Sequence, residues 1–238
     1  MSQTVPVEPP AGVSVVITAF NCGRYLGQAI GSVLGQTRPP GQVILLDDGS
    51  TDDCQDVAKA FGRAVEYVHQ PNTGVAAARN AGARRSRLAW LAYLDGDDYW
   101  EPDKLERQLA AAQSAPHVDA FFGHVQQFIS PELAPEERAR VQVPEMLMPG
   151  VCVGTLLIRR DALEQVGPFN ETWNGSEFLD WYARAVEAGL EMLVLPQRLG
   201  WRRVHLSNLS RRLGSTQAYT HTLKALLDRR RQALRRQG

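Results

Sequence analysis

The sequence has few cysteines, and they form no recognisable pattern. Cys22, Cys54 and Cys152 lie far apart along the 238 residues, and they are the only three cysteines. No two of them have the spacing of metal ligands, and an odd number at such distances does not indicate a disulfide framework. We therefore expect buried free thiols in a protein of the reducing cytoplasm.

An excess of one charge and long hydrophobic runs are also absent. Lys plus Arg and Asp plus Glu both number 26, so the overall charge gives no reason to expect a nucleic-acid partner. No apolar run approaches the roughly 20 residues that a membrane helix needs. Residues 1–11 are Pro-rich, lack the basic and apolar regions of a signal peptide, and predict a disordered leader. We expect a soluble, cytoplasmic protein.

Short apolar runs that alternate with segments of helical spacing are present instead. The first hundred residues predict strands over 13–20, 42–46, 65–68 and 88–94, and helices over 25–36, 53–61 and 75–86. Strand–helix units in series indicate an α/β domain in which helices cover both faces of a parallel sheet. The rest predicts a helix to 113, a strand over 119–122, a Pro-containing loop over 130–149, a strand over 153–158, helices over 160–166 and 177–188, and a strand over 190–195.

Two acidic turns follow strands of this predicted sheet. Asp95-Gly96-Asp97-Asp98 comes after the run 89–94, and Asp47-Asp48-Gly49-Ser50 comes after 42–46. Ligands bind beyond the carboxyl ends of parallel strands, so both turns are expected on the binding rim. Carboxylates this close repel one another unless a cation compensates them, and Mg²⁺ and Mn²⁺ prefer oxygen ligands. One acidic turn is common, but two on one rim indicate a metal and phosphate site.

A helix of small residues follows a third turn. Asn72-Thr73-Gly74 leads into a segment whose middle carries Arg79 and Asn80. A glycine turn and a closely packed helix explain most of this composition. If Arg79 faces the rim, its guanidinium can neutralise phosphate or order an acidic loop.

Four stretches of the chain carry a resemblance through their order and spacing. They are Val-Ser-Val-Val-Ile-Thr-Ala-Phe-Asn at 13–21, Leu-Leu-Asp-Asp-Gly-Ser-Thr-Asp at 45–52, Asn-Thr-Gly-Val-Ala-Ala-Ala-Arg-Asn-Ala-Gly at 72–82 and Tyr-Leu-Asp-Gly-Asp-Asp-Tyr-Trp-Glu-Pro-Asp at 93–103. Each stretch is unspecific by itself. The ordered set resembles the family 2 inverting glycosyltransferases of the GT-A fold, densely over 12–113 and more thinly over 150–210.

This resemblance implies a domain organisation and a reaction. A GT-A domain with a mostly parallel central sheet is expected over 12–210, with a nucleotide-sugar-binding half at 12–113 and an acceptor-side half at 114–210. A basic helical tail is expected over 211–238. The implied reaction transfers a sugar from a nucleotide-sugar donor, UDP-linked by this resemblance, to an acceptor hydroxyl with inversion.

The resemblance also implies roles for residues on the donor side. Thr18 and Phe20 would line the nucleobase pocket, where Asp48 would accept a hydrogen bond from uracil or thymine. Arg79 would lie near the donor phosphates, and Asp95 would contact the ribose or the donor sugar.

A metal ion belongs to the same implied site. Asp97 would be the main protein ligand of Mn²⁺ or Mg²⁺. His205, in the segment Arg202-Arg-Val-His205-Leu-Ser-Asn208, would be a second metal or phosphate contact. A lone histidine is also often structural, although imidazole is a common metal ligand.

The catalytic base is the point at which the sequence departs from the family. The family's base comes from a Glu-Asp pair at the start of a helix, and alignment on Arg184 places Glu177 at the Glu and Phe178 at the Asp. Glu177 is the first candidate for the base and Asp180 the second. Asp180 has an alternative explanation as an i,i+4 ion pair with Arg184. If neither carboxylate reaches the acceptor, the alternative is a weakened or altered enzyme, or an inactive nucleotide-sugar-binding protein of the same fold.

Two further questions stay open in the sequence. The tail from 223 to 238 carries five arginines beside leucines, which predicts either a solvated helix docked through its leucines or a contact with an anionic membrane surface or a second subunit. The donor sugar and the acceptor are not identified. A nucleotidyltransferase is rejected because no Gly-rich phosphate loop follows the first strand.

Overall fold

The computed structural model describes residues 11–208 except 142, 145, 149 and 174. The predicted basic tail at 211–238 lies outside the described residues, and so does the predicted leader apart from its last residue. None of the helices in the described part combines the length and the hydropathy that a membrane span requires.

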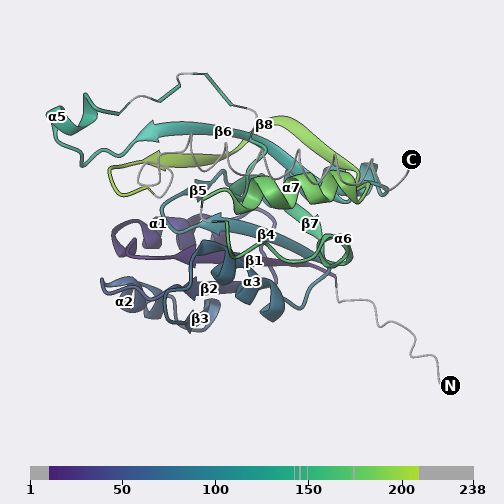
Figure 1. Cartoon of the computed structure of the whole chain (residues 1–238), viewed down its shortest axis with the longest axis horizontal. Coiled ribbons are helices and arrows are strands. Elements are labelled where there is room, and N and C mark those ends of the chain that lie inside the picture. Colours follow the sequence, from purple (N-terminus) through teal and green to yellow (C-terminus); the bar gives the residue numbers. More distant parts are fainter. Residues whose placement is uncertain (1–10, 142, 145, 149, 174, 209–238) are drawn as a thin grey trace.

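The described residues form one eight-stranded sheet in the order β3-β2-β1-β4-β7-β6-β8-β5 (Figure 1). Its first part is parallel and consists of β1 (Val13–Ala19), β2 (Gln42–Asp47), β3 (Glu66–His69) and β4 (Trp90–Asp95). Its second part consists of β7 (Leu157–Arg159), β6 (Ala120–Ile129), β8 (Met192–Val204) and the short β5 (Tyr99–Trp100). β7 runs antiparallel to both β4 and β6. β6 and β8 are parallel to each other, and β5 runs antiparallel to β8. The predicted mostly parallel α/β sheet is confirmed.

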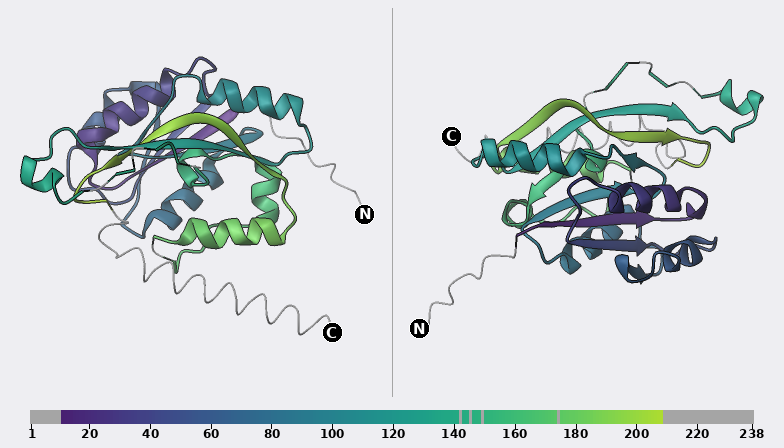
Figure 2. Two further views of the ribbon diagram at one scale, coloured as in Figure 1. Left: turned by 90° about the horizontal axis from the view of Figure 1, so that it is seen from above. Right: turned by 180° about the vertical axis from the view of Figure 1, so that it is seen from behind.

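Helices cover both faces of the sheet (Figure 2). One face carries α1 (Gly23–Leu34), α2 (Cys54–Lys59) and α4 (Lys104–Ser114), and the other carries α3 (Val75–Arg85), α6 (Arg160–Val166) and α7 (Glu177–Glu187). Every residue of β1 is buried. Because alternate side chains of a strand point to opposite faces, Val15 and Ile17 join the core under α1 and α4, while Val16 joins the core under α3 and α7.

A glycine sets how closely α3 approaches the sheet. A Cβ atom on Gly82 would lie 2.3 Å from Cγ1 of Val16 in β1. The helix therefore packs directly on the central strand. This close packing brings the middle of α3, where Arg79 lies, near the carboxyl end of the sheet.

The same substitution at two glycines is expected to have opposite effects on stability. Gly82→Ala overpacks the contact with Val16, which costs about 1–3 kcal/mol. Gly31→Ala on α1 meets no atom within 4 Å, and removing a helical glycine there adds roughly 0.4–1 kcal/mol. Urea unfolding of both variants measures whether each substitution lowers or raises the free energy of unfolding. Equal effects would show that α3 has room to move away from β1.

The second half of the sheet is longer than the sequence predicts. The strand predicted at 119–122 runs to Ile129, and the strand predicted at 190–195 runs to Val204. Their outer parts carry half-buried polar residues, and register shifts interrupt the pairing between Phe122 and Val125. The predicted strand at 153–158 is a 3₁₀ turn, η2 (Val153–Thr155), followed by β7. The predicted loop at 130–149 contains one short helix, α5 (Pro135–Arg138).

Candidate functional site

The candidate site lies at the carboxyl ends of β1, β2 and β4, where the sequence places both acidic turns. Thr18 of β1 pairs in register with Asp95 of β4, and its hydroxyl donates to Asp95 Oδ1 at 3.3 Å. Asp48 follows β2 directly. Phe20 follows β1 and is 43% exposed, which leaves its ring accessible at the rim.

Asp48 holds the turn that precedes α3. Its Oδ1 accepts hydrogen bonds from the backbone N–H of Thr73 at 3.0 Å and from Gln70 Nε2 at 2.8 Å, and its Oδ2 accepts one from the N–H of Gly74 at 2.8 Å. Each carboxylate oxygen has two lone pairs, so a ligand donor can still be accepted at Oδ2. The buried Asp48 carboxylate therefore fixes the loop 72–74 beside the rim.

Arg79 joins two carboxylates that are far apart in the sequence. Its Nη2 lies 2.7 Å from Asp95 Oδ1, and its Nη1 lies 2.5 Å from Glu177 Oε1. Burial alone would lower the pKa of Arg79, but Asp95 and Glu177 raise it above its ordinary value. Burial would likewise raise the pKa of Asp95, but Arg79 holds it below its usual range. The guanidinium and the Asp95 carboxylate therefore stay charged.

Glu177 keeps one carboxylate oxygen free of the ion pair. It is the first residue of α7 and is 5% exposed. Oε1 is bound to Arg79, whereas Oε2 is buried without a hydrogen-bond partner among the described residues. An oxygen in this state can accept a proton or a hydrogen bond from a ligand.

Asp180, the second candidate base, is engaged elsewhere on α7. Arg184 Nε donates to Asp180 Oδ2 at 3.0 Å, one helical turn along. The other nitrogens of Arg184 donate to the carbonyl oxygens of Val166 and Pro168. The structure thus contains the i,i+4 ion pair that the sequence offered as the alternative explanation.

The turn after β4 is tied to the end of β8. Asp97 Oδ2 lies 2.9 Å from His205 Nε2 and accepts a hydrogen bond from Asn208 Nδ2 at 3.1 Å. Arg203 donates its backbone N–H to Asp98 Oδ1 at 2.7 Å and its Nε to the carbonyl of Asp97 at 3.0 Å. The structure therefore places the predicted pair Asp97 and His205 together.

Three residues of this network escaped the sequence analysis. Arg203 and Asn208 stand in the segment that was singled out only for His205, and Asp98 is the third carboxylate of the acidic turn. Burial, and then Asp97 and Asp95, raise the pKa of Asp98 well above its ordinary value. The signal for Arg203 and Asn208 is the density of polar residues at 202–208, and the signal for Asp98 is its place in the acidic turn.

The donor set fits a hard cation that arrives with a phosphate ligand. No group of three or more His, Cys, Asp or Glu side chains in the described part of the chain forms a ready-made metal site. Mg²⁺ and related cations are usually bound by one or two carboxylates together with substrate phosphates. Asp97 and His205 together would provide two protein ligands, one of them a carboxylate.

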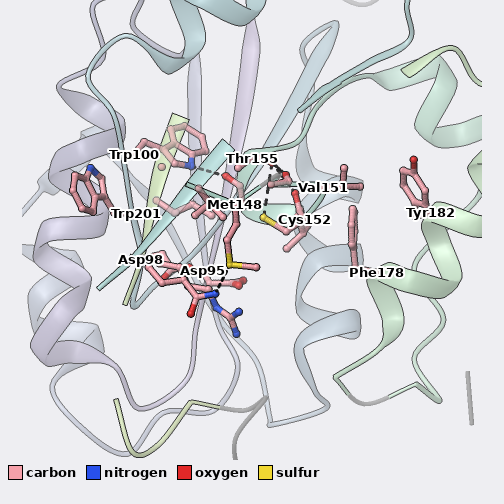
Figure 3. Close-up of a pocket in the computed structure, with 18 of the residues that line it drawn as sticks. Asp95, Asp98, Trp100, Met148, Val151, Cys152, Thr155, Phe178, Tyr182 and Trp201 are labelled. Atoms are coloured by element: carbon pink, nitrogen blue, oxygen red, sulfur yellow. Dashed lines mark hydrogen bonds between the residues drawn. The ribbon is translucent and has the colours of Figure 1, made fainter. Parts of the chain in front are cut away.

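A cavity of about 490 Å³ opens beside Asp95 and Asp98, and its lining among the described residues does not include Asp97 or His205, nor the predicted nucleobase contacts Thr18, Phe20 and Asp48. Figure 3 shows Asp95 and Asp98 below Trp100 and Trp201, with Phe178 and Tyr182 at the opposite side of the cavity. Arg79 and Glu177 also line it, whereas Asp180 is not among the described residues that do. The structure therefore brings Asp95, Arg79 and Glu177 to one cavity.

Comparison with known proteins gives both a family and relatives. The model of the family described as glycosyl transferase family 2 matches residues 14–167, more than half of the chain. TuaG of Bacillus subtilis (strain 168), whose name assigns it to teichuronic acid biosynthesis as a glycosyltransferase, is 34% identical over 116 residues, which are 47% of this chain and 46% of TuaG. An uncharacterised glycosyltransferase of Nostoc sp. (strain PCC 7120) is 37% identical over 110 residues, 44% of this chain and 34% of that protein. The chain thus spans less than half the length of these relatives.

Solved structures of similar fold include those of S. aureus TarS. The complex of TarS with UDP has a TM-score of 0.65 at 18% identity, covering 81% of this chain and 60% of that one. The complex of TarS with UDP-GlcNAc has a TM-score of 0.68 at 18% identity, covering 84% and 60%. At this identity the likeness establishes the GT-A fold.

Proposed function

The chain belongs to glycosyl transferase family 2, and we propose that it transfers a sugar from a UDP-linked donor to an acceptor hydroxyl with inversion. The observation that carries the proposal is the arrangement around Arg79. This residue holds Asp95, at the end of β4, and Glu177, at the start of α7, on one cavity. Arg79 thereby keeps the donor-side carboxylate of Asp95 and the proposed base, Glu177, at a fixed separation.

The donor is proposed to bind along the rim of β1, β2 and β4. Thr18 and Phe20 line the nucleobase pocket and Asp48 accepts a hydrogen bond from the base, while Asp95 contacts the ribose or the sugar. The fold likeness to TarS, whose structures hold UDP and UDP-GlcNAc, supports UDP as the carrier. Arg79 was predicted to lie near the donor phosphates, and its two ion pairs add a second role, which is to position Asp95 and Glu177.

Mn²⁺ or Mg²⁺ is proposed to bind at Asp97 and His205 together with the donor diphosphate. When bound, such a cation stabilises the negative charge that develops on the departing diphosphate. Arg203 and Asn208 hold Asp97 in place through the hydrogen bonds described above. The side-chain contact between His205 and Asp97 keeps both groups at one point of the rim.

Glu177 is proposed to be the general base. Its unpartnered Oε2 accepts the proton of the acceptor hydroxyl as that oxygen attacks the anomeric carbon. Attack from the face opposite the leaving diphosphate inverts the configuration at that carbon. Asp180 stays the second candidate, and its ion pair with Arg184 makes it the weaker one.

Asp97→Ala is expected to abolish the stabilisation of the protein by UDP. With UDP at about 100 times its Kd and Mn²⁺ present, the wild-type free energy of unfolding rises by about 2.7 kcal/mol, which raises Tm by roughly 5–10 °C for a chain of this size. A thermal-shift panel of nucleotides and nucleotide sugars, with and without Mn²⁺, measures this.

The matched control is Asp56→Ala, which removes a carboxylate from an exposed pair with Lys59 and should leave the UDP shift intact. If UDP stabilises Asp97→Ala as much as the wild type, Asp97 does not bind the metal. If no uridine nucleotide stabilises the wild type, the proposed donor is wrong.

A further inference from the structure

The cavity beside Glu177 has two kinds of lining. Ionisable side chains gather around Asp95, Asp98 and Glu177. The wall that continues from Glu177 along α7 and over to β6 and the loop before η2 carries several apolar side chains, namely Val125, Met148, Val151, Phe178 and Tyr182, with Gln127 and Thr155 as polar members of the lining. A ligand whose hydroxyl reaches Glu177 therefore has apolar side chains of the same lining nearby, of which Figure 3 labels Met148, Val151, Phe178 and Tyr182.

The apolar wall is held rigidly. Phe178 lies in a cluster of aromatic rings, with ring centroids 6.1 Å from Phe122 and 6.2 Å from Tyr182. Met148 is fixed to Val125 of β6 by two backbone hydrogen bonds of 3.0 and 3.1 Å. Aromatic packing and backbone pairing of this kind present a preformed surface, which lowers the entropic cost of binding.

Two tryptophans, Trp100 and Trp201, line the other side of the cavity. Trp100 Nε1 donates to the carbonyl of Gly154 at 2.8 Å, and Trp201 Nε1 donates to Glu101 Oε1 at 2.7 Å. Their polar atoms are thus already bonded within the protein. Lys104 lies over the ring of Trp100, and Arg198 and Tyr99 lie over the ring of Trp201, so these residues offer a ligand mainly their ring edges.

The apolar surface extends beyond the cavity. Met146 is 78% exposed and Leu147 is 37% exposed, and both directly precede Met148. Exposed apolar side chains of this kind can add contact area for an apolar ligand that reaches past Met148.

From these observations we infer that the acceptor is an alcohol with an apolar aryl or alkyl group attached next to the hydroxyl that receives the sugar. The hydroxyl meets Glu177 Oε2, and the apolar group lies against Met148, Val151 and Phe178. A wholly polar acceptor would lose hydration against this wall without gaining hydrogen bonds. This inference rests on the proposed function, because it names the substrate class of the same site.

A matched pair of acceptor probes tests the inference. Phenyl β-D-glucopyranoside and methyl β-D-glucopyranoside differ only in the apolar group, so any mismatch of the sugar part cancels. Their affinities are measured by calorimetry on the full chain saturated with UDP and Mn²⁺. The phenyl compound is expected to bind about tenfold more tightly, the order expected for partial burial of a ring.

Variants of the apolar wall show where the phenyl group binds. Met148→Gln and Val151→Thr place polar atoms on the wall at similar size, and each is expected to reduce the phenyl preference to roughly threefold or less, since a polar atom there must be desolvated. Val186→Thr on α7 is the control, because Val186 is 54% exposed and outside the cavity lining; it should keep the full preference. UDP binding by each variant reports that it is folded.

The outcomes separate the inference from the function on which it rests. Failure of the wild type to bind UDP contradicts the proposed function. UDP binding with equal affinities for the two glucosides, or with no binding of either, overturns the apolar acceptor. A preference that survives both Met148→Gln and Val151→Thr also overturns it, because the phenyl group would then lie elsewhere.

Discussion

Glu177→Gln is expected to lower the rate of UDP release from the correct donor by about 10²- to 10⁴-fold, the range for loss of a general base. Gln has the same shape as Glu, and its amide oxygen can still accept the hydrogen bond from Arg79. The change therefore removes the proton acceptor at the position of Oε2, which is buried and unpartnered in the wild type. Steady-state kinetics should show the loss in kcat, with little change in UDP affinity.

The control for this variant is Asp180→Asn, on the same helix. Asp180 is bound to Arg184, so its loss should cost some stability but leave kcat within a few-fold of the wild type. The opposite result, with Asp180→Asn inactive and Glu177→Gln active, would transfer the role of the base to Asp180. Loss of UDP binding by Glu177→Gln would instead mean that the variant disrupts the donor site.

Arg79→Met is expected to destabilise the protein by about 3–5 kcal/mol at pH 7, because removing one partner of a buried ion pair leaves an uncompensated buried charge. Here two carboxylates, on Asp95 and Glu177, lose the same cation. For a chain of this size the loss corresponds to a fall in Tm of roughly 6–20 °C. Urea unfolding monitored by circular dichroism measures it.

The destabilisation of Arg79→Met should shrink as the pH falls from 7 to 5. In the wild type Arg79 holds the pKa of Asp95 below its unfolded value, so this contribution is present above about pH 3.9 and is lost only as the pH falls below it. In the variant Arg202 and Thr18 still lower the pKa of Asp95, but burial, the largest influence on it, raises it. The pH dependence of the Asp95 contribution to stability is therefore reversed. Protonation of Asp95 at lower pH stabilises the variant, and this stability is lost as the pH rises.

Arg85→Met on the same helix is the matched control. Arg85 lies 4.0 Å from Glu66, and both side chains are more than 40% exposed. An exposed pair of this kind contributes about 0–1 kcal/mol, with little dependence on pH between 5 and 7. If Arg79→Met were no less stable than Arg85→Met, the Asp95–Arg79–Glu177 arrangement would not be a structural element of the site.

The sequence predicts the first half of the fold well because its signals are local. Each residue of β1 is apolar or small, and each acidic turn follows its strand directly, so the rim with Asp48 and Asp95 could be placed before the structure was known. The Asp180–Arg184 pair was also foreseeable, since residues four apart on a helix face each other.

The second half depends on contacts that no local pattern shows. Arg79 meets Glu177 across 98 positions of the chain, and Arg203 meets Asp97 across 106. The long strands β6 and β8 carry polar residues over their outer parts, so neither alternation nor an apolar run marks their ends. Their register shifts lie between Phe122 and Val125, where no local sequence pattern marks them.

UDP release from a panel of UDP-sugars, with water or an added alcohol as acceptor, should be compared between the wild type and Glu177→Gln to test whether the protein is a metal-dependent transferase with Glu177 as its base. The account predicts that the wild type releases UDP from at least one donor only when Mn²⁺ or Mg²⁺ is present, and that Glu177→Gln releases it at least about 10²-fold more slowly. Binding of UDP without release from any donor would contradict the account and identify a nucleotide-sugar-binding protein. Release that does not depend on Glu177 would contradict its assignment as the base.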